Sequence, residues 1–343
     1  MPDLIATFSD RCSDPRMRTF TRDLILFLGF QAFVLGAFLG LFYRPALANP
    51  LVATTVLKHR LLREQVPPRV ILVGGSNVLY GFDSPTIQQQ TGLNPVNMGL
   101  IGGLRLDYLL NEVQCQVQDG DLVVLALEYN QLLARFGTPR SAVILAQVLE
   151  NRVANVQYIR WHHLRKLADH GLVSQLGLAL REAIKRARRL GRNEKKDMPK
   201  VNEFGDLLEH RDQPMQARAR QHRPMKRRFD WSVVDGAINR LNRFAEHCRS
   251  RGAEVIYTFP PIPKVQFGNL AKVIQMIEVQ LKADLELPLV NRPSQMVFPI
   301  SYFYDSANHL RGEGVFERSR RVADSINRYR EDIQRTHCNQ ARE

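Results

Sequence analysis

The chain has 343 residues, of which 44% are hydrophobic and 24% are charged, a balance that is typical of a globular protein and excludes an intrinsically disordered one. A chain of this length can bury one large hydrophobic core or two modest ones. The formal net charge of +14 favours an anionic partner, such as nucleic acid, anionic lipid or an acidic polysaccharide.

The first strong signal along the chain is an uncharged run at residues 24–43, which predicts a membrane-spanning helix. A helix of that length rises about 30 Å, enough to cross the hydrocarbon core of a bilayer. Four cations precede the run: Arg11, Arg16, Arg18 and Arg22. Because cations concentrate on the cytoplasmic side, we expect residues 1–23 to form a cytoplasmic tail and the body of the protein to lie outside the cytoplasm, in a periplasmic or extracellular space.

Two other interpretations of this run remain. A buried core helix fits poorly, because such helices rarely lack a polar face over this length. A cleaved signal peptide is the stronger rival, because Ala46 and Ala48 form an Ala-x-Ala pattern that a signal peptidase could use. The leader and its apolar run are long for a signal peptide, so we prefer an uncleaved anchor. The body is exported in either case.

Beyond a linker or connecting helix at residues 44–68, apolar strands alternate with helical patterns. We expect strands at the start of 69–82 and within 95–103, 121–130, 253–259 and 287–291, and helices at 104–117, 231–252, 270–285 and 314–330. Continuously apolar strands that alternate with helices predict an α/β fold with a mostly parallel central sheet covered on both faces.

The alternation stops between residues 136 and 228, which we interpret as a basic, partly helical insertion that divides the main domain into 69–135 and 229–343. Its basic runs are either a solvated surface or a contact with phosphate headgroups or an acidic glycan. Nucleic acid is not favoured as a partner, because no aromatic residues are interleaved with the cations and no binding motif is present.

Candidate catalytic residues follow the predicted strands. Ligands of parallel sheets bind at the carboxyl ends of the strands, where Ser76, Gly102 and Asn130 stand. A serine nucleophile needs a base and a third group that orients the base. His309 follows Asp305 by four residues in a predicted loop, so the two side chains can pair and leave one ring nitrogen for the Ser76 proton.

An oxyanion hole can be assembled from the same strand ends. The donors would be the backbone N–H groups of Ser76 and Gly102 and the side-chain amide of Asn130. Each residue alone also fits a structural role, as a turn, a loop hydrogen bond or a helix cap. Their order along the chain favours a common site.

This order of motifs resembles the SGNH or GDSL hydrolase superfamily, which has a serine after the first strand, a glycine after the second, an asparagine after the third and an Asp/His pair near the C-terminus. The matching segments are residues 74–77, 97–103, 127–130 and 305–310. The resemblance implies a three-layer fold over residues 69–330. The chain departs from the pattern at Gly75, where the motif has an acidic residue, and at Glu128 and Gln131, where it has glycine and aspartate.

Within that superfamily the chain resembles the membrane-tethered branch that includes teichoic-acid D-alanylation and exopolysaccharide O-acetylation proteins. The resemblance implies that Ser76 attacks an acyl ester, that His309 acts as base and then acid, that Asp305 orients it, and that water or a sugar hydroxyl resolves the acyl-serine. The expected partners are an acyl-bearing glycan or cell-envelope polymer, the membrane, and a separate membrane protein that donates the acyl group.

Other readings stay open. A degenerate member of the superfamily could bind a glycan without turnover, and an assembly protein could act through the basic insertion. We expect no cofactor and no metal, because the chain has no glycine-rich phosphate loop and no Cys/His cluster. Cys12 precedes the apolar run, and at most one disulfide is expected among Cys115, Cys248 and Cys338. The acyl group, the polymer and the direction of transfer do not follow from the sequence.

Overall fold

A parallel sheet lies at the centre of the structure, a computed structural model that describes residues 15–42, 50–133, 153–159, 199–220 and 231–340. Its strands run in the order β2-β1-β3-β4. They are β1 (Arg69–Gly74), β2 (Asn94–Asn97), β3 (Leu122–Ala126) and β4 (Glu254–Tyr257). All three neighbouring pairs are parallel, so the predicted α/β class with a parallel sheet is confirmed.

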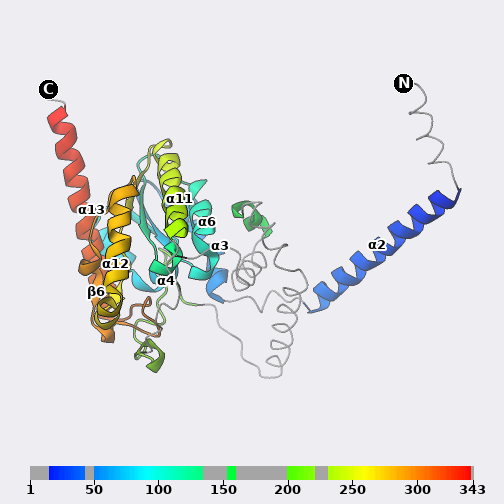
Figure 1. The fold of residues 1–343 in the computed structure, drawn as a ribbon, viewed down its shortest axis with the longest axis horizontal. Helices are drawn as coiled ribbons and strands as arrows, with labels where there is room; N and C mark the ends of the chain where they lie inside the picture. The colour runs from blue at the N-terminus through cyan, green and yellow to red at the C-terminus, as the bar shows by residue number, and fades with distance from the viewer. Residues whose placement is uncertain (1–14, 43–49, 134–152, 160–198, 221–230, 341–343) are drawn as a thin grey trace.

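Helices cover both faces of the sheet, which explains why β1 and β3 are buried along their whole length. The covering helices are α4 (Ser76–Gly81), α5 (Ser84–Thr91), α6 (Arg105–Gln114), α11 (Trp231–Arg249) and α13 (Glu313–Gln340). Helices α6 and α11 pack together on one side, and α13 packs on α5 on the other (Figure 1). The last helix, predicted at 314–330, is longer in the structure and ends at Gln340.

Smaller elements complete the described part of the chain. They are α7 (Tyr129–Leu132), α12 (Lys264–Asp284), β5 (Ile262–Pro263), β6 (Val297–Phe298), and the short 3-10 helices η2 (Gly102–Leu104), η3 (Val153–Tyr158), η4 (Ala217–Arg220), η5 (Pro293–Met296) and η6 (Ile300–Tyr302). Strands β5 and β6 pair with each other. The strand expected at 287–291 is present only as a single bridge between Leu289 and Tyr257.

The register of β1 on β3 is fixed at its amino end by a buried ion pair. Gly74 lies opposite Ala126 in this register. One residue before the paired segment, Arg69 Nε donates to Asp121 Oδ1 at 2.8 Å, and both side chains are fully buried. The pair places the starts of β1 and β3 opposite each other. The residues that follow the two strands therefore lie opposite each other as well.

Two segments that the sequence assigned to a linker and to the insertion pack into this body. Helix α3 (Pro50–Glu64) carries Lys58, whose Nζ donates to Asn97 O at 2.6 Å and to Gly205 O at 2.7 Å. Burial lowers the pKa of Lys58 to about 7. Asp206 is also buried and accepts the Ser84 hydroxyl at 2.8 Å. Residues 199–220 thus reach the main domain, whereas the rest of 136–228, apart from 153–159, lies outside the described residues.

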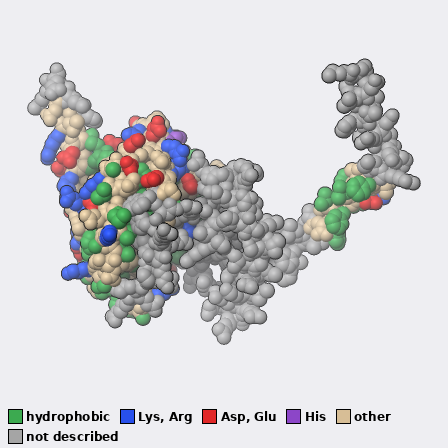
Figure 2. All heavy atoms as spheres, viewed as in Figure 1, with side chains coloured by type: hydrophobic (Ala, Val, Ile, Leu, Met, Phe, Trp, Pro, Cys, Tyr) green, Lys and Arg blue, Asp and Glu red, His purple; other side chains and the backbone are tan. Residues whose placement is uncertain are grey.

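The N-terminal apolar run forms part of helix α2 (Pro15–Phe42). Large apolar side chains are exposed along it, and they appear as the green spheres in Figure 2: Phe20, Leu24, Ile25, Leu26, Phe27, Leu28, Phe30 and Phe33. Among the described residues, no helix meets both the length and the apolar content required to cross a bilayer. The span predicted at 24–43 therefore finds no support in the structure and stays a prediction.

Candidate active site

Strand β1 ends on two glycines because other groups come close to its backbone at that point. A Cβ on Gly74 would lie 2.3 Å from Ala126 O of the neighbouring strand. A Cβ on Gly75 would lie 3.0 Å from Glu128 Oε1 and 3.1 Å from the Gly102 Cα. The close approach explains why no acidic side chain stands at position 75, and it brings Ser76, the first residue of α4, to the end of the sheet.

The hydroxyl of Ser76 pairs with a carboxylate that follows β3. Ser76 Oγ donates to Glu128 Oε1 at 2.7 Å, and the Asn77 backbone N–H donates to the same oxygen at 3.1 Å. The register explains this contact, because Gly74 faces Ala126 and the residues two positions later, Ser76 and Glu128, meet beyond the strand ends. Glu128 is only 3% exposed.

A second charged pair comes from the loop before α13. His309 Nδ1 lies 2.5 Å from Asp305 Oδ1, and Arg218 Nη2 lies 2.6 Å from Asp305 Oδ2. Burial alone would raise the pKa of Asp305, but the hydrogen bond and charge of His309, together with Arg218, outweigh it and lower that pKa. The carboxylate is therefore ionised at neutral pH and can hold the His309 ring in one orientation.

Tyr80 connects the His309 loop to the helix that carries Ser76. Its ring stacks on the His309 imidazole with 4.1 Å between ring centroids and 7° between the planes. Tyr80 follows Ser76 by four residues in α4, so the two side chains lie on the same face of that helix. His210 contacts Tyr80 edge-on, and its Nε2 lies 2.7 Å from Tyr80 O. Burial raises the pKa of Tyr80 to about 12 and lowers that of His210 to about 4.

The five residues that the sequence proposed are not all brought together. Within the described part of the chain, no hydrogen bond joins Ser76 to His309. Gly102 lies beside the site, because a Cβ there would be 3.1 Å from Glu128 Oε2. Asn130 stands in α7 with an exposed side chain and makes no hydrogen bond to the other four. Glu128 occupies the position at which we expected Asn130.

A buried cation lies beneath the serine. Arg318 of α13 is fully buried, its Nη1 donates to Asn77 O at 2.5 Å, and its guanidinium lies 4.0 Å from the centre of the Phe82 ring. Burial lowers the pKa of Arg318 to about 9, and the charge of Glu128 acts in the opposite direction. The site therefore contains a buried carboxylate and a buried guanidinium that partly compensate each other.

Sequence reasoning missed several of these residues for different reasons. Glu128 was noted only as a departure from a motif, although a carboxylate directly after a buried strand is itself a signal of function. Tyr80 carried a weaker signal, its spacing of four from Ser76. His210 and Arg218 fall in the predicted insertion, where no pattern pointed to the site.

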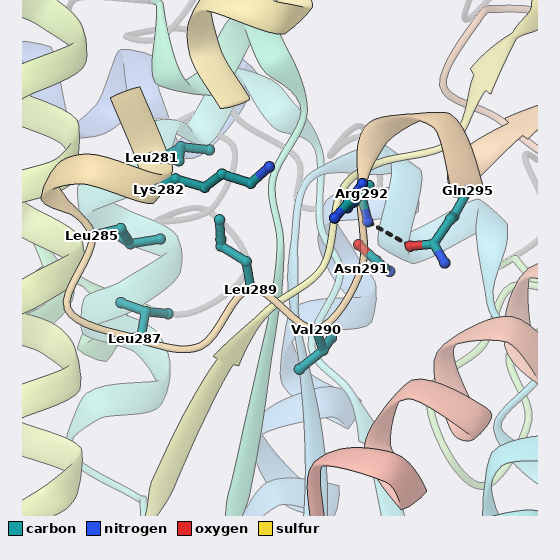
Figure 3. A pocket seen from close by; sticks show the side chains of 9 residues that line it. All are labelled: Leu281, Lys282, Leu285, Leu287, Leu289, Val290, Asn291, Arg292 and Gln295. Atoms are coloured by element: carbon teal, nitrogen blue, oxygen red, sulfur yellow. Dashed lines mark hydrogen bonds between the residues drawn. The ribbon is translucent and has the colours of Figure 1, made fainter. Parts of the chain in front are cut away.

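A hollow of about 480 Å³ lies elsewhere, at the edge of the sheet beyond β4 (Figure 3). Its walls are Leu281, Lys282, Leu285, Leu287, Leu289, Val290, Asn291, Arg292 and Gln295. Figure 3 shows the Lys282 side chain pointing from α12 toward the side of the hollow where Arg292 lies. No serine, histidine or carboxylate is among these lining residues, so the hollow lacks the serine and the Asp/His pair that lie in the Ser76 region, and we look for the chemistry in the Ser76 region.

Two further findings bear on the site. Within the described ranges, no group of three His, Cys, Asp or Glu side chains is arranged to hold a metal ion, and Cys115, Cys248 and Cys338 are free thiols. Comparisons of the chain with protein-family models, with curated proteins and with solved structures found no match. The function is therefore inferred from the residues described above.

Proposed function

We propose that the chain is a serine esterase or O-acyltransferase of the SGNH type that acts on acyl esters of a cell-surface or exported polysaccharide. The observation that carries the proposal is the stacking of His309 on Tyr80 at 4.1 Å, because it holds an Asp305-oriented imidazole against the helix that begins with Ser76. Ser76 is the nucleophile, and water or a sugar hydroxyl resolves the acyl-serine.

The arrangement of the sheet supports this assignment of the site. Strand order β2-β1-β3-β4 makes the chain cross from one side of β1 to the other, so a switch point lies between β1 and β3. Ligands of open parallel sheets bind at such points, beyond the carboxyl ends of the strands. Ser76 and Glu128 follow those two strands. The three-layer arrangement of helices around the sheet is consistent with an SGNH-like fold.

The location and substrate are part of the same proposal. The exposed apolar side chains of α2 support attachment to a membrane through residues 24–43, with the C-terminal domain outside the cytoplasm. The net charge of +14 fits an anionic polymer or membrane surface. An acyl donor would be supplied by a separate membrane protein.

One observation favours a second candidate, a glycan-binding protein without turnover. The Ser76 hydroxyl is hydrogen-bonded to Glu128 Oε1, and Glu128 Oε2 lies beside Gly102. A negative charge at that place opposes the oxyanion that an acyl transfer must form. In this alternative, the polar residues at the sheet end hold sugar hydroxyls and Ser76 forms no covalent bond.

Labelling of the full-length protein in detergent tests the two candidates. A fluorophosphonate probe should label the wild type and Ser250→Ala, whose serine is exposed in the turn after α11, but not Ser76→Ala. Hydrolysis of p-nitrophenyl acetate should follow the same pattern. Labelling that persists in Ser76→Ala would refute the assignment of the nucleophile. A wild type that neither reacts with the probe nor hydrolyses the ester would favour the binding protein.

A further inference from the structure

The partner of the Ser76 hydroxyl is the most unusual feature of the site. Glu128 Oε1 accepts from Ser76 Oγ at 2.7 Å, within the range for direct proton transfer, whereas no hydrogen bond among the described residues links Ser76 to His309. The Asn77 N–H donates to the same oxygen at 3.1 Å and fixes its position. Glu128 is therefore already placed as a proton acceptor for the serine.

The groups around this carboxylate are hydrogen-bond donors and one cation. Both groups that contact Oε1 are donors, so this oxygen accepts two hydrogen bonds and is held in place. The charged group that faces Glu128 from the packed elements is Arg318 of α13, which is buried beneath Asn77. The Gln131 amide of α7 approaches from the other side, and its Oε1 accepts the Glu128 backbone N–H at 2.8 Å.

From this geometry we infer that Glu128 is the general base for Ser76, and that His309 with Asp305 instead serves the leaving and accepting oxygens. The inference rests on the proposed function, since it assigns the proton transfers of that reaction. The Ser76–Glu128 pair and the Asp305–His309 pair then have different roles. Glu128 activates the nucleophile, and His309, stacked on Tyr80, exchanges a proton with the alcohol oxygen of the ester.

The reaction has two halves. The Ser76 proton passes to the Glu128 carboxylate while Ser76 Oγ bonds to the acyl carbon. The bond from that carbon to the ester oxygen then breaks, and protonated His309 gives its proton to the departing alcohol. In the second half, water or a sugar hydroxyl gives a proton to His309 and attacks the acyl carbon. Ser76 leaves and recovers its proton from Glu128, so no oxidant, reductant or metal is needed.

This order of transfers removes the electrostatic obstacle beside Gly102. Glu128 Oε2 would lie 3.1 Å from a Cβ on that glycine, so the ionised carboxylate is next to the expected oxyanion position. Once Glu128 has taken the Ser76 proton it is neutral, and this happens as negative charge develops on the substrate oxygen. A histidine base would leave the Glu128 charge in place during the same step.

Two variants and two types of reagent test the inference on the full-length protein. A fluorophosphonate releases fluoride, which needs no proton from an acid, so its labelling rate reports activation of Ser76. We expect Glu128→Gln to lower that rate at least 100-fold and His309→Asn to lower it less than tenfold. Glu128→Asp, which keeps the charge but withdraws it, should fall between wild type and Glu128→Gln.

Ester substrates with different leaving groups complete the test. His309→Asn should lose at least 100-fold in hydrolysis of an acetylated sugar, whose alcohol needs protonation, and much less with p-nitrophenyl acetate.

A labelling loss of less than about tenfold in Glu128→Gln, or of more than about tenfold in His309→Asn, overturns the inference. If Glu128→Gln labels as fast as wild type while His309→Asn does not label, His309 is the base and the inference is overturned, but the proposed function survives. If wild type is inert toward both the probe and the esters, the proposed function and the inference fall together. Glu313→Gln, a change at an exposed glutamate paired with Arg320 at 2.6 Å, is the control and should label like wild type. Thermal melts of each variant identify any that do not fold.

Discussion

The buried ion pair at the start of the two central strands should be essential for stability. Asp121 receives both Arg69 Nε and Arg69 Nη2, and neither side chain is exposed to solvent. Arg69 also donates to Leu62 O and to Gln116 O, so the guanidinium joins α3, the turn after α6 and the starts of both strands. Asp121→Asn keeps the shape of the side chain but removes the charge that compensates Arg69.

Breaking one partner of a buried pair costs about 3–5 kcal/mol, because the other charge stays buried without compensation. Because a whole domain is stable by only about 5–15 kcal/mol, the Asp121→Asn variant should unfold at a much lower urea concentration. The measurement is urea unfolding followed by circular dichroism, with the slope m unchanged. The control is Glu313→Gln, which removes an exposed pair with Arg320 and should cost about 0–1 kcal/mol.

A double variant separates the loss of a compensated charge from the loss of packing. Arg69→Met combined with Asp121→Leu removes both charges, so it should recover most of the stability that Asp121→Asn loses. If Asp121→Asn loses less than about 1 kcal/mol, no more than Glu313→Gln is expected to lose, the ion pair does not set the register and our reasoning on β1 and β3 is refuted.

Three further changes test the site. Gly75→Ala places a Cβ 3.0 Å from Glu128 Oε1, so we expect an overpacking cost of about 1–3 kcal/mol in urea unfolding and slower fluorophosphonate labelling; unchanged labelling would contradict the close approach. Arg218→Gln removes the exposed partner of Asp305, and since such pairs contribute about 0.2–1 kcal/mol, ester hydrolysis should fall less than about fivefold; a larger loss would show that Arg218 contacts substrate. His210 has a folded-state pKa of about 4, below its ordinary value of about 6.5, so the unfolded state binds the proton first as pH falls. Stability should therefore drop by roughly 3 kcal/mol between about pH 6.5 and about pH 4. His210→Gln should reduce this drop in unfolding measured at several pH values, and an unchanged pH dependence would contradict a buried, neutral His210.

The sheet could be predicted from the sequence because its strands carry their own signal. Residues 122–126 are continuously apolar, the pattern expected of a strand covered on both faces, and all five are buried in the structure. Helix α11 was predicted at 231–252 and is observed at Trp231–Arg249, ending near the glycine that marked its end. Helix α13 continues to Gln340 because its charged sequence contains no glycine or proline after 330 to end it.

The packing of residues 199–220 could not be predicted, since it depends on buried polar contacts with distant parts of the chain. Asp206 accepts hydrogen bonds from Ser84 and from Asn97, and Lys58 reaches Gly205. None of these residues forms an apolar period along 199–220, so the sequence placed the segment in the basic, partly helical insertion and not in the main domain. Burial of such polar groups is favourable only when all partners are present, which is a property of the fold and not of a local pattern.

The same difference between local and distant contacts explains which residues of the candidate site could be predicted. The spacing of Asp305 and His309 is local, and the pair forms as expected at 2.5 Å. The contact of Ser76 with Glu128 depends on the register of two strands that are separated by a helical crossover, so no local pattern could report it. The departure from the family motif at position 128 was nevertheless visible. A buried carboxylate in place of a glycine changes which group can accept a proton. Such a departure from a motif therefore predicts a different proton transfer, and not only a lower similarity to the motif.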